Sequence, residues 1–258
     1  MKTLSPRLKA AAREHLEGRY VTIILAYMIA NMLTNLPSLL FSETFNTNTL
    51  QGYSLNTFAN LILVFFTAIF LVGQNYICLQ CIRGAEAVPL SEMWYGFRGR
   101  ADEIIKTYFL YLIRYLASGL PFAILAVCYI RGNRAPLLGI LALVALIFML
   151  ILWIKINLDY GILLFLFVDR TDLSPSQMLT ECKKIMQGNR MRLLYLHLSF
   201  IGMFLLVLLS FGIAMFWLYP YMKMTYGEFY CHLVNENYAE KTHIENKSIE
   251  NENIKEGA

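Results

Sequence analysis

The sequence has few charged residues, and this scarcity excludes most classes of soluble protein. Only 16% of the 258 residues are charged, whereas 57% are hydrophobic. Soluble domains are usually about 45–50% apolar. The apolar residues form long blocks, each near the roughly 20 residues that cross a bilayer as a helix. We therefore predict one polytopic membrane domain of the all-α class, because unpaired strand edges are too costly in lipid.

The chain also lacks the cysteine pattern that a disulfide scaffold or a zinc site requires. Its five cysteines are an odd number, and most lie in or beside apolar blocks, which disfavours a disulfide scaffold. Cys78 and Cys81 form one C-x-x-C motif, but no second pair and no paired histidines complete a zinc site. We expect no metal and no cofactor, and we expect buried cysteines that act as small hydrophobic residues.

Catalytic motifs are missing as well. The sequence has no Gly-x-Ser-x-Gly elbow, no His-Glu-x-x-His, no phosphate loop and no carboxylate pair inside an apolar block. We therefore do not expect an enzyme. The formal charge of +4 does not indicate nucleic acid, because the basic residues cluster beside apolar blocks, as in membrane threading. The lipid bilayer is the expected partner.

Six apolar segments are predicted to span the membrane. They are residues 20–41, 58–79, 106–130, 136–156, 193–209 and 213–233. Basic residues gather before the first, third and fifth segments, which places both termini in the cytoplasm under the positive-inside rule and indicates a cytoplasmic membrane. Residues 193–233 could instead form one span with the C-terminus outside, but the sequence Ser210-Phe211-Gly212 favours a hairpin.

The segments outside the spans differ in character. Residues 1–19 are predicted to form a cytoplasmic amphipathic helix, residues 20–233 the membrane domain, and residues 234–258 an acidic tail. The tail has no apolar periodicity, which predicts disorder. The fourth apolar block continues from Pro136 to Val168, about 50 Å as a helix. Either this helix tilts strongly or its last turns leave the membrane, and the second is favoured by the polar residues Lys155, Asn157 and Asp159.

Three short segments that end in glycine precede pairs of spans. In the clearest one, Ser174 suits an N-cap before Pro175, apolar residues follow one helix face, and Gly188 suits the left-handed residue after a helix. Similar segments end at Gly18 and Gly99. They could be divergent copies of one helix-plus-hairpin unit, or ordinary basic entries to spans. They could bind a protein partner, but we favour a role in covering the cytoplasmic ends of the spans.

Ionisable side chains within apolar segments are costly and therefore mark a candidate site. Arg114 in the third span and Asp159 at the end of the fourth could form an intramembrane pair. Alternatively, Arg114 extends to the interface and Asp159 bonds to Lys155 four residues earlier. Asn157 and His197 are further polar candidates, although a lone hydrogen-bonded histidine is commoner than a proton relay.

A series of motifs lies along the chain in a specific order. They include Ala12-Arg13 through Gly18, Trp94-x-Gly96-Phe97, Tyr160 through Asp169, and a C-terminal set containing Gly188, Asn189, Ser199, Phe200, Gly202, Gly212, Trp217, Pro220, Tyr221, Phe229 and Tyr230. This combination resembles domain-of-unknown-function family 975, a family of bacterial integral membrane proteins. The family often has a Pro-Gly step before Tyr160, which this chain lacks, so the resemblance leaves open whether the chain kinks there. It implies fold and location but no reaction.

Two functions from different classes remain open. The first is a non-enzymatic membrane-organising or accessory component that acts through protein or lipid contacts. The second is a small transporter of a hydrophobic or amphiphilic solute, for which the region of Arg114 and Asp159 and the proline-interrupted spans could form the pathway. A water-accessible cavity lined by Arg114, Asn157 and Asp159 would favour transport, whereas a filled core would favour the organising role.

Overall fold

The computed structural model describes residues 4–45, 49–85, 87–132 and 136–256, with side chains described as far as residue 236. Within these ranges the elements are helices and no strand occurs, which confirms the all-α class. In chain order they are α1 (Leu4–Leu16), α2 (Tyr20–Thr44), α3 (Leu50–Ile82), η1 (Leu90–Phe97), α4 (Ala101–Arg131), α5 (Pro136–Asp159), α6 (Leu163–Asp169), α7 (Pro175–Met186), α8 (Arg190–Leu198), α9 (Ile201–Leu209) and α10 (Met215–Glu256).

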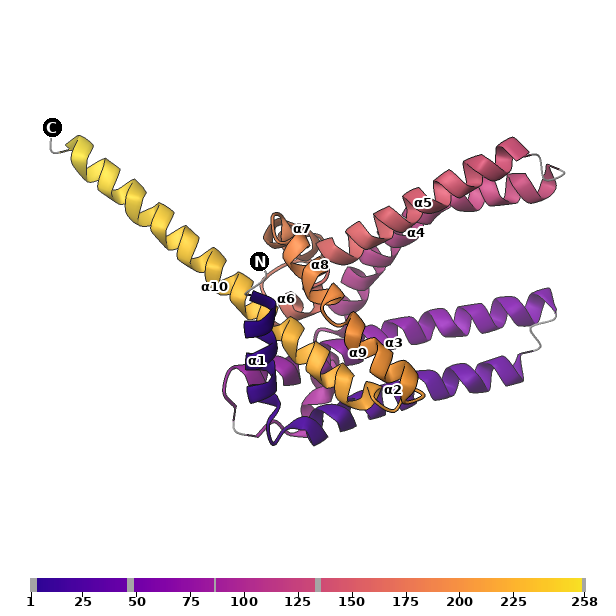
Figure 1. Ribbon diagram of the computed structural model, residues 1–258, viewed down its shortest axis with the longest axis horizontal. Coiled ribbons are helices and arrows are strands. Elements are labelled where there is room, and N and C mark those ends of the chain that lie inside the picture. The colour runs from indigo at the N-terminus through magenta and orange to yellow at the C-terminus, as the bar shows by residue number, and fades with distance from the viewer. Residues whose placement is uncertain (1–3, 46–48, 86, 133–135, 257–258) are drawn as a thin grey trace.

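Long helical hairpins dominate the shape of the molecule. α2 pairs with α3 and α4 pairs with α5, and both pairs project in the same direction (Figure 1). Among the described residues, five helical segments are long and apolar enough to cross a membrane: Tyr20–Thr44, Leu50–Ile82, Ala101–Arg131, Pro136–Asp169 and Arg190–Leu209. Their length and composition identify a membrane protein.

The sixth predicted span, residues 213–233, is not among these segments. α10 carries Lys223 and Glu228, which lower its hydropathy. From Leu218 to Leu233 most of its apolar side chains are buried by protein, with Leu218 6% exposed and Leu233 fully buried. The described chain therefore has five candidate spans and not six. The predicted hairpin is present, because Phe211 and Gly212 have positive φ angles of 49° and 91° and reverse the chain between α9 and α10.

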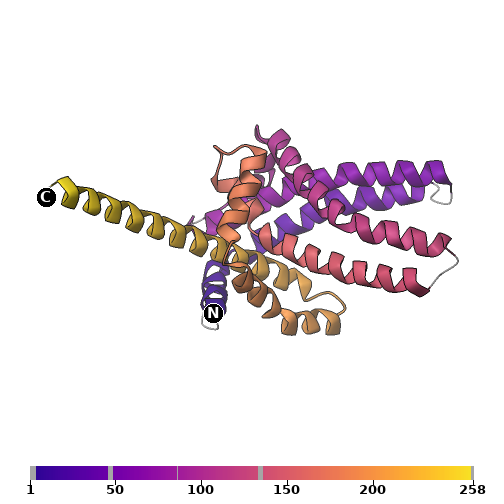
Figure 2. The same ribbon diagram turned by 90° about the horizontal axis from the view of Figure 1, so that it is seen from above.

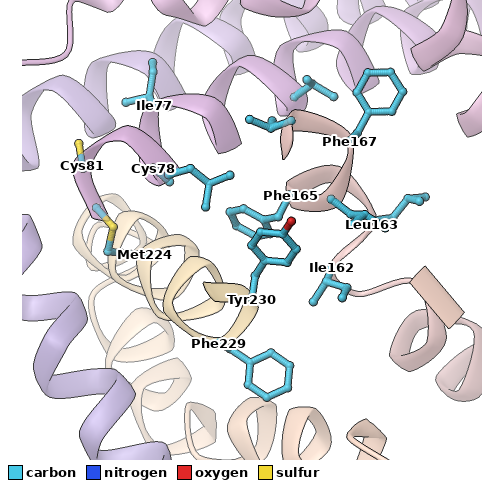
Figure 3. Close-up of a cluster of buried hydrophobic side chains, with 14 of the residues drawn as sticks. Ile77, Cys78, Cys81, Ile162, Leu163, Phe165, Phe167, Met224, Phe229 and Tyr230 are labelled. Carbon is cyan, nitrogen blue, oxygen red and sulfur yellow. The ribbon is translucent and has the colours of Figure 1, made fainter. Parts of the chain in front are cut away.

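The ends of the hairpins opposite their tips join in a packed assembly that we call the hub. It comprises α1, η1, α6, α7, α8 and residues 68–82 and 218–233. Figure 3 shows its centre, where Cys78 of α3, Phe165 of α6 and Tyr230 of α10 converge. The rings of Phe165 and Tyr230 stack with centroids 5.9 Å apart. Burial of such apolar surface, at about 25 cal/mol per Å², makes the hub the core of the fold.

The fourth apolar block breaks where it enters the hub. α5 ends at Asp159, and α6 begins at Leu163 with most of its residues buried. A Cβ at Gly161 would lie 2.5 Å from Leu193 Cδ2, so glycine permits the close approach of α8 at this break. The structure confirms that the last turns of this block pack against the hub, although the family's Pro-Gly step is missing here.

The short helices have the predicted ends. The backbone N–H and the hydroxyl of Ser174 donate to Gln177 Oε1 at 3.0 and 2.8 Å, at the start of α7. Gly18, Gly99 and Gly188 have φ angles of 74°, 85° and 86°, which only glycine adopts without strain. The apolar faces of α1 and α7 turn into the hub, so these helices cover the ends of the long hairpins.

Buried residues recur at fixed distances from these three glycines. The positions are six residues before (Ala12, Met93, Cys182), five after (Ile23, Ile104, Leu193) and eight after (Ala26, Thr107, Leu196). The three short helices also make corresponding contacts. Helix η1 packs on α3, α7 packs on α6, and α1 packs on α10. Each short helix therefore contacts the end of a different hairpin, and the three contacts close into a ring.

The C-terminal part of α10 leaves the hub as a single projecting helix (Figure 1). The structure is helical to Glu256, over most of the segment that we predicted to be disordered. The segment contains no proline and no glycine between Gly227 and Gly257, so nothing in the sequence ends a helix that begins in the hub. The last two residues lie outside the described ranges.

Candidate functional site

A pocket of about 390 Å³ lies at the base of the α4–α5 hairpin, against α7. It contains three of the residues that the sequence analysis selected, namely Arg114, Lys155 and Asp159. The break between α5 and α6 creates its floor, because the chain turns away into the hub after Asp159. The pocket is lined by Arg114, Leu152, Lys155, Ile156, Asp159, Tyr160, Leu179, Thr180 and Lys183.

Asp159 is the buried acid of this pocket, with 5% of the residue exposed. Its carboxylate pairs with the guanidinium of Arg190 at the start of α8. Arg114 does not form that pair, and instead its Nη1 donates to the hydroxyl of Tyr160 at 3.1 Å. The structure thus brings the predicted residues Arg114 and Asp159 to one site but gives each a different partner. In the described chain, Lys155 forms no ion pair with Asp159 either.

α7 supplies the second wall of the pocket. The thiol of Cys182 donates to the backbone oxygen of Asp159 at 3.4 Å. Burial raises the pKa of this thiol, which keeps it a neutral donor. Thr180 and Lys183 reach the pocket from the outer face of α7. Lys183 was not among the residues selected from the sequence, because its distance from Arg114 along the chain hides their proximity.

The remaining polar candidates lie outside this pocket. Asn157 Nδ2 donates to the backbone oxygen of Trp153 at 2.8 Å. The Nδ1 atom of His197 lies 2.9 Å from the backbone oxygen of Leu193, and its ring stacks on Tyr226 with centroids 4.9 Å apart. His197 therefore bonds within its own helix, and these contacts describe a packed side chain.

The residues of the family motifs fall into two groups. Gly18, Gly188 and Gly212 form turns with positive φ, and Asn189 Nδ2 donates to the backbone oxygen of Ile185 at 3.0 Å beside one of them. Gly202 and Trp217 lie on the hairpin formed by α9 and α10, where Trp217 is 59% exposed. The others pack in the hub or begin the part of α10 that enters it: Ser199, Phe200, Pro220, Tyr221, Phe229 and Tyr230.

A second pocket of about 280 Å³ lies between α2, α3 and α10. The hydroxyl of Tyr219 donates to Gln74 Oε1 at 2.7 Å, and Lys223 Nζ donates to Asn75 Oδ1 at 3.3 Å. The ring of Tyr27 stacks on that of Tyr219 at 3.8 Å. Sequence analysis missed this cluster, although adjacent amides at Gln74 and Asn75 within an apolar block were a usable signal.

Charged contacts also tie the hub together. Arg83 Nη2 donates to Asp169 Oδ1 at 2.6 Å, and the hydroxyl of Tyr230 donates to Asp169 Oδ2 at 2.8 Å. His15 Nδ1 lies 2.6 Å from Glu228 Oε1. These contacts join α3 to α6, α6 to α10 and α1 to α10, so they fix the relative positions of the hairpins.

Comparison with known proteins gives one match. The sequence model of the family described as "Protein of unknown function (DUF975)" matches residues 1–237. No curated protein and no solved structure matches the chain. The match agrees with the resemblance found in the motifs and covers every described hairpin, but it carries no activity.

Proposed function

We propose, for a chain that belongs to the DUF975 family of unknown function, a non-enzymatic role in organising the membrane through lipid contacts. The non-enzymatic part of this proposal rests on the sequence, which has no catalytic motif. The lipid contacts are those of the hairpins, and the hub holds the hairpins at a fixed spacing. One observation carries the proposal, namely that the hairpins diverge.

The long hairpins separate as they leave the hub (Figure 2). Each hairpin packs internally, as where Tyr115 of α4 stacks on Trp153 of α5 at 4.6 Å. However, no residue in the most apolar window of α4 is buried, and only 6% of the corresponding window from Pro136 to Asp169 is buried. Ordinary helix bundles bury one face of each helix against its neighbours. The exposed apolar faces between these hairpins therefore need lipid as their contact.

The α9–α10 hairpin supports a shallow insertion from the hub side. In the candidate span Arg190–Leu209, α8 packs in the hub, with Leu193 2% and Leu196 1% exposed. This leaves the nine residues of α9, about 14 Å of helix, which is about half of a 30 Å hydrocarbon core. Its tip is apolar, with Phe211 98% exposed and Leu209 76% exposed. A hairpin of this depth enters and leaves on one side, so both termini lie on the side of the hub. The basic residues before the spans favour the cytoplasm for that side.

The recurrent burial around Gly18, Gly99 and Gly188 supports three divergent units, each a short helix followed by a hairpin. The ring of contacts between the short helices and neighbouring hairpins is the arrangement expected of such units. The apolar faces of α1 and α7 are already occupied within the protein. An accessory partner would therefore have to bind elsewhere, which favours lipid over protein as the first contact.

The number of lipids that the protein immobilises tests this proposal. Spin-labelled phospholipid in reconstituted vesicles reports the motionally restricted lipids per protein. We expect more restricted lipids than around a compact bundle of the same mass, because lipid also fills the spaces between the hairpins. A count equal to that of the compact control, or a stoichiometric protein partner in those spaces, would contradict the proposal.

The alternative function, transport of an amphiphilic solute, is favoured by one observation, the polar pocket between α2, α3 and α10. Gln74 and Tyr219 place hydrogen-bonding groups beside a stacked aromatic pair, which suits a solute with apolar and polar parts. Flux of a fluorescent amphiphile from vesicles tests it. Transport predicts flux that is lost in Tyr219→Phe and kept in Tyr53→Phe, a change at an exposed tyrosine near the hairpin tip.

A further inference from the structure

We propose that the pocket at the base of the α4–α5 hairpin binds a phosphate group, and that its ligand is the headgroup of an anionic phospholipid. The phosphate chemistry comes from the pocket alone. The choice of a lipid as the source rests on the proposed function, because it requires the hairpins to stand in lipid.

Charge is the first argument. Arg114 from α4, Lys155 from α5 and Lys183 from α7 line the pocket, so three elements each contribute one cation. The acid in the pocket is Asp159, and its charge is already balanced by Arg190. Among the described residues, Lys155 and Lys183 have no acidic partner within 4 Å. The pocket therefore carries net positive charge that a doubly or singly charged phosphate would balance.

The hydrogen-bonding capacity of Arg114 is the second argument. A guanidinium has five N–H donors in a planar fork, and in the described structure one of them bonds, to the hydroxyl of Tyr160. Arg114 stands among lipid-facing side chains, since Ile113 is 46% exposed and Leu116 is 61% exposed. Unbonded donors are costly beside hydrocarbon. Phosphate oxygens match the fork and can accept from two donors at once.

Position is the third argument, and it favours a lipid over a soluble ion. The pocket lies where the hairpin leaves the hub, which is the level of the headgroups if the hairpins span the bilayer. Toward the tip of the hairpin from this pocket, the surface of α5 is apolar, with Ile151 57% and Ile154 55% exposed. A phospholipid could therefore place its phosphate against Arg114 and Lys155 while its acyl chains lie along α5.

A related pocket of about 330 Å³ lies between α1 and α8, and it shows why the first is preferred. Its Arg13 precedes Gly18 by five residues, as Lys183 precedes Gly188, so the two pockets occupy corresponding places. In this second pocket, however, Lys9 Nζ donates to the backbone oxygen of Ser199 at 2.8 Å and lies 4.0 Å above the Phe200 ring. The charge of Lys9 already has partners, whereas in the described structure the charges of Lys155 and Lys183 have none.

The test measures binding of fluorescent phosphatidylglycerol to the full-length protein in phosphatidylcholine nanodiscs. We expect Arg114→Gln to weaken binding about tenfold or more, because it removes a charge-assisted pair of hydrogen bonds. Lys155→Gln and Lys183→Gln should each weaken it about threefold, as single point charges do at an interface. Lys184→Gln is the matched control, since it removes the same charge from the adjacent position of α7 outside the pocket and should leave binding unchanged.

Two further arms separate the possible outcomes. Inorganic phosphate that displaces the lipid at millimolar concentration would assign the pocket to a soluble phosphate and overturn the lipid assignment. Equal affinity for phosphatidylcholine and phosphatidylglycerol, with all four variants unchanged, would overturn the site entirely. That last result would leave the proposed function intact if the vesicles still showed excess restricted lipid, so the two proposals fail separately. Variants are compared only where size-exclusion chromatography shows a monodisperse protein.

Discussion

The hub and the hairpins contain the same kinds of apolar residue in different surroundings. In the hub, Leu79 and Phe200 are fully buried by protein, whereas in the α9–α10 hairpin Leu208 is 75% exposed and Phe211 is 98% exposed. Hub side chains must fit one another at the density of a protein interior. The lipid-facing side chains of the hairpins need only be apolar, on helices long enough to cross the bilayer. Shape therefore constrains the hub, and hydrophobicity is the main constraint on the outer faces of the hairpins.

The largest expected effect comes from the same truncation made once in each region. Leu79→Ala should lower the free energy of unfolding by about 4 kcal/mol, within the range for buried leucines. Leu208→Ala should change it by less than about 0.5 kcal/mol, as for an exposed position. Unfolding by sodium dodecyl sulfate in mixed micelles measures both. Equal losses at the two positions would mean that the hairpin tip is buried by protein in the membrane.

The ion pair between Asp159 and Arg190 is the next test. Arg190→Gln leaves a buried carboxylate without its partner and should cost about 3 kcal/mol, the lower end of the range for buried pairs, because the arginine is partly exposed. The double variant Arg190→Gln with Asp159→Asn should recover much of the loss. A double variant as unstable as the single one would show that the two charges do not interact.

A smaller effect is expected where η1 crosses α3. A Cβ at Gly73 would overlap the backbone carbonyl of Met93, so Gly73→Ala should force η1 away and cost about 2 kcal/mol through overpacking. Gly202→Ala is the control, because a Cβ there meets nothing within 4 Å. Thermal unfolding followed by size-exclusion chromatography compares the two. A stable Gly73→Ala protein would show that η1 is loosely held.

The smallest stability change is expected at the tip of the short hairpin, where the readout is depth. Phe211→Trp, made after the native tryptophans are replaced by phenylalanine, should leave the unfolding free energy within about 0.5 kcal/mol. Its fluorescence should be quenched most by lipids brominated near the ends of their acyl chains, since the tip should reach the middle of the bilayer. Strongest quenching by bromines near a headgroup would contradict insertion to half depth, because the tip would then lie at one of the two membrane surfaces.

The hairpins were the part of the fold that the sequence predicted well. Long apolar blocks predicted α2 to α5, and the turn signal at Ser210 to Gly212 predicted the reversal after α9, because composition and turn chemistry are local properties. The caps of α7 at Ser174 and Gly188 were equally local. The predicted span at residues 213–233 is not among the candidate spans, because local composition does not show whether a segment packs against lipid or against protein. Its apolar residues are spaced for contact with protein, and Lys223 and Glu228 are tolerated because the hub surrounds them.

The candidate site was predicted only in part. Arg114 and Asp159 attracted attention because charges are rare in apolar segments, and both line the pocket. Their partners, Tyr160 and Arg190, depend on how α7 and α8 pack against the α5–α6 break, which is a long-range property. The polar cluster of Gln74 and Tyr219 likewise joins helices that are distant in the sequence, and no periodicity in one helix reveals such a pair.

The short α9–α10 hairpin has a consequence for the two leaflets of the bilayer. Because α9 is only about 14 Å long, the proposed insertion from the hub side would give this hairpin area in the leaflet next to the hub and none in the opposite leaflet, while the longer hairpins would cross both. The protein would then take up area unequally in the two leaflets, with the helices of three hairpins in the hub-side leaflet and of two in the opposite leaflet, where the diverging long hairpins leave room for lipid between them. A hairpin inserted into one leaflet alone expands that leaflet relative to the other, which favours bending that makes the hub-side surface convex.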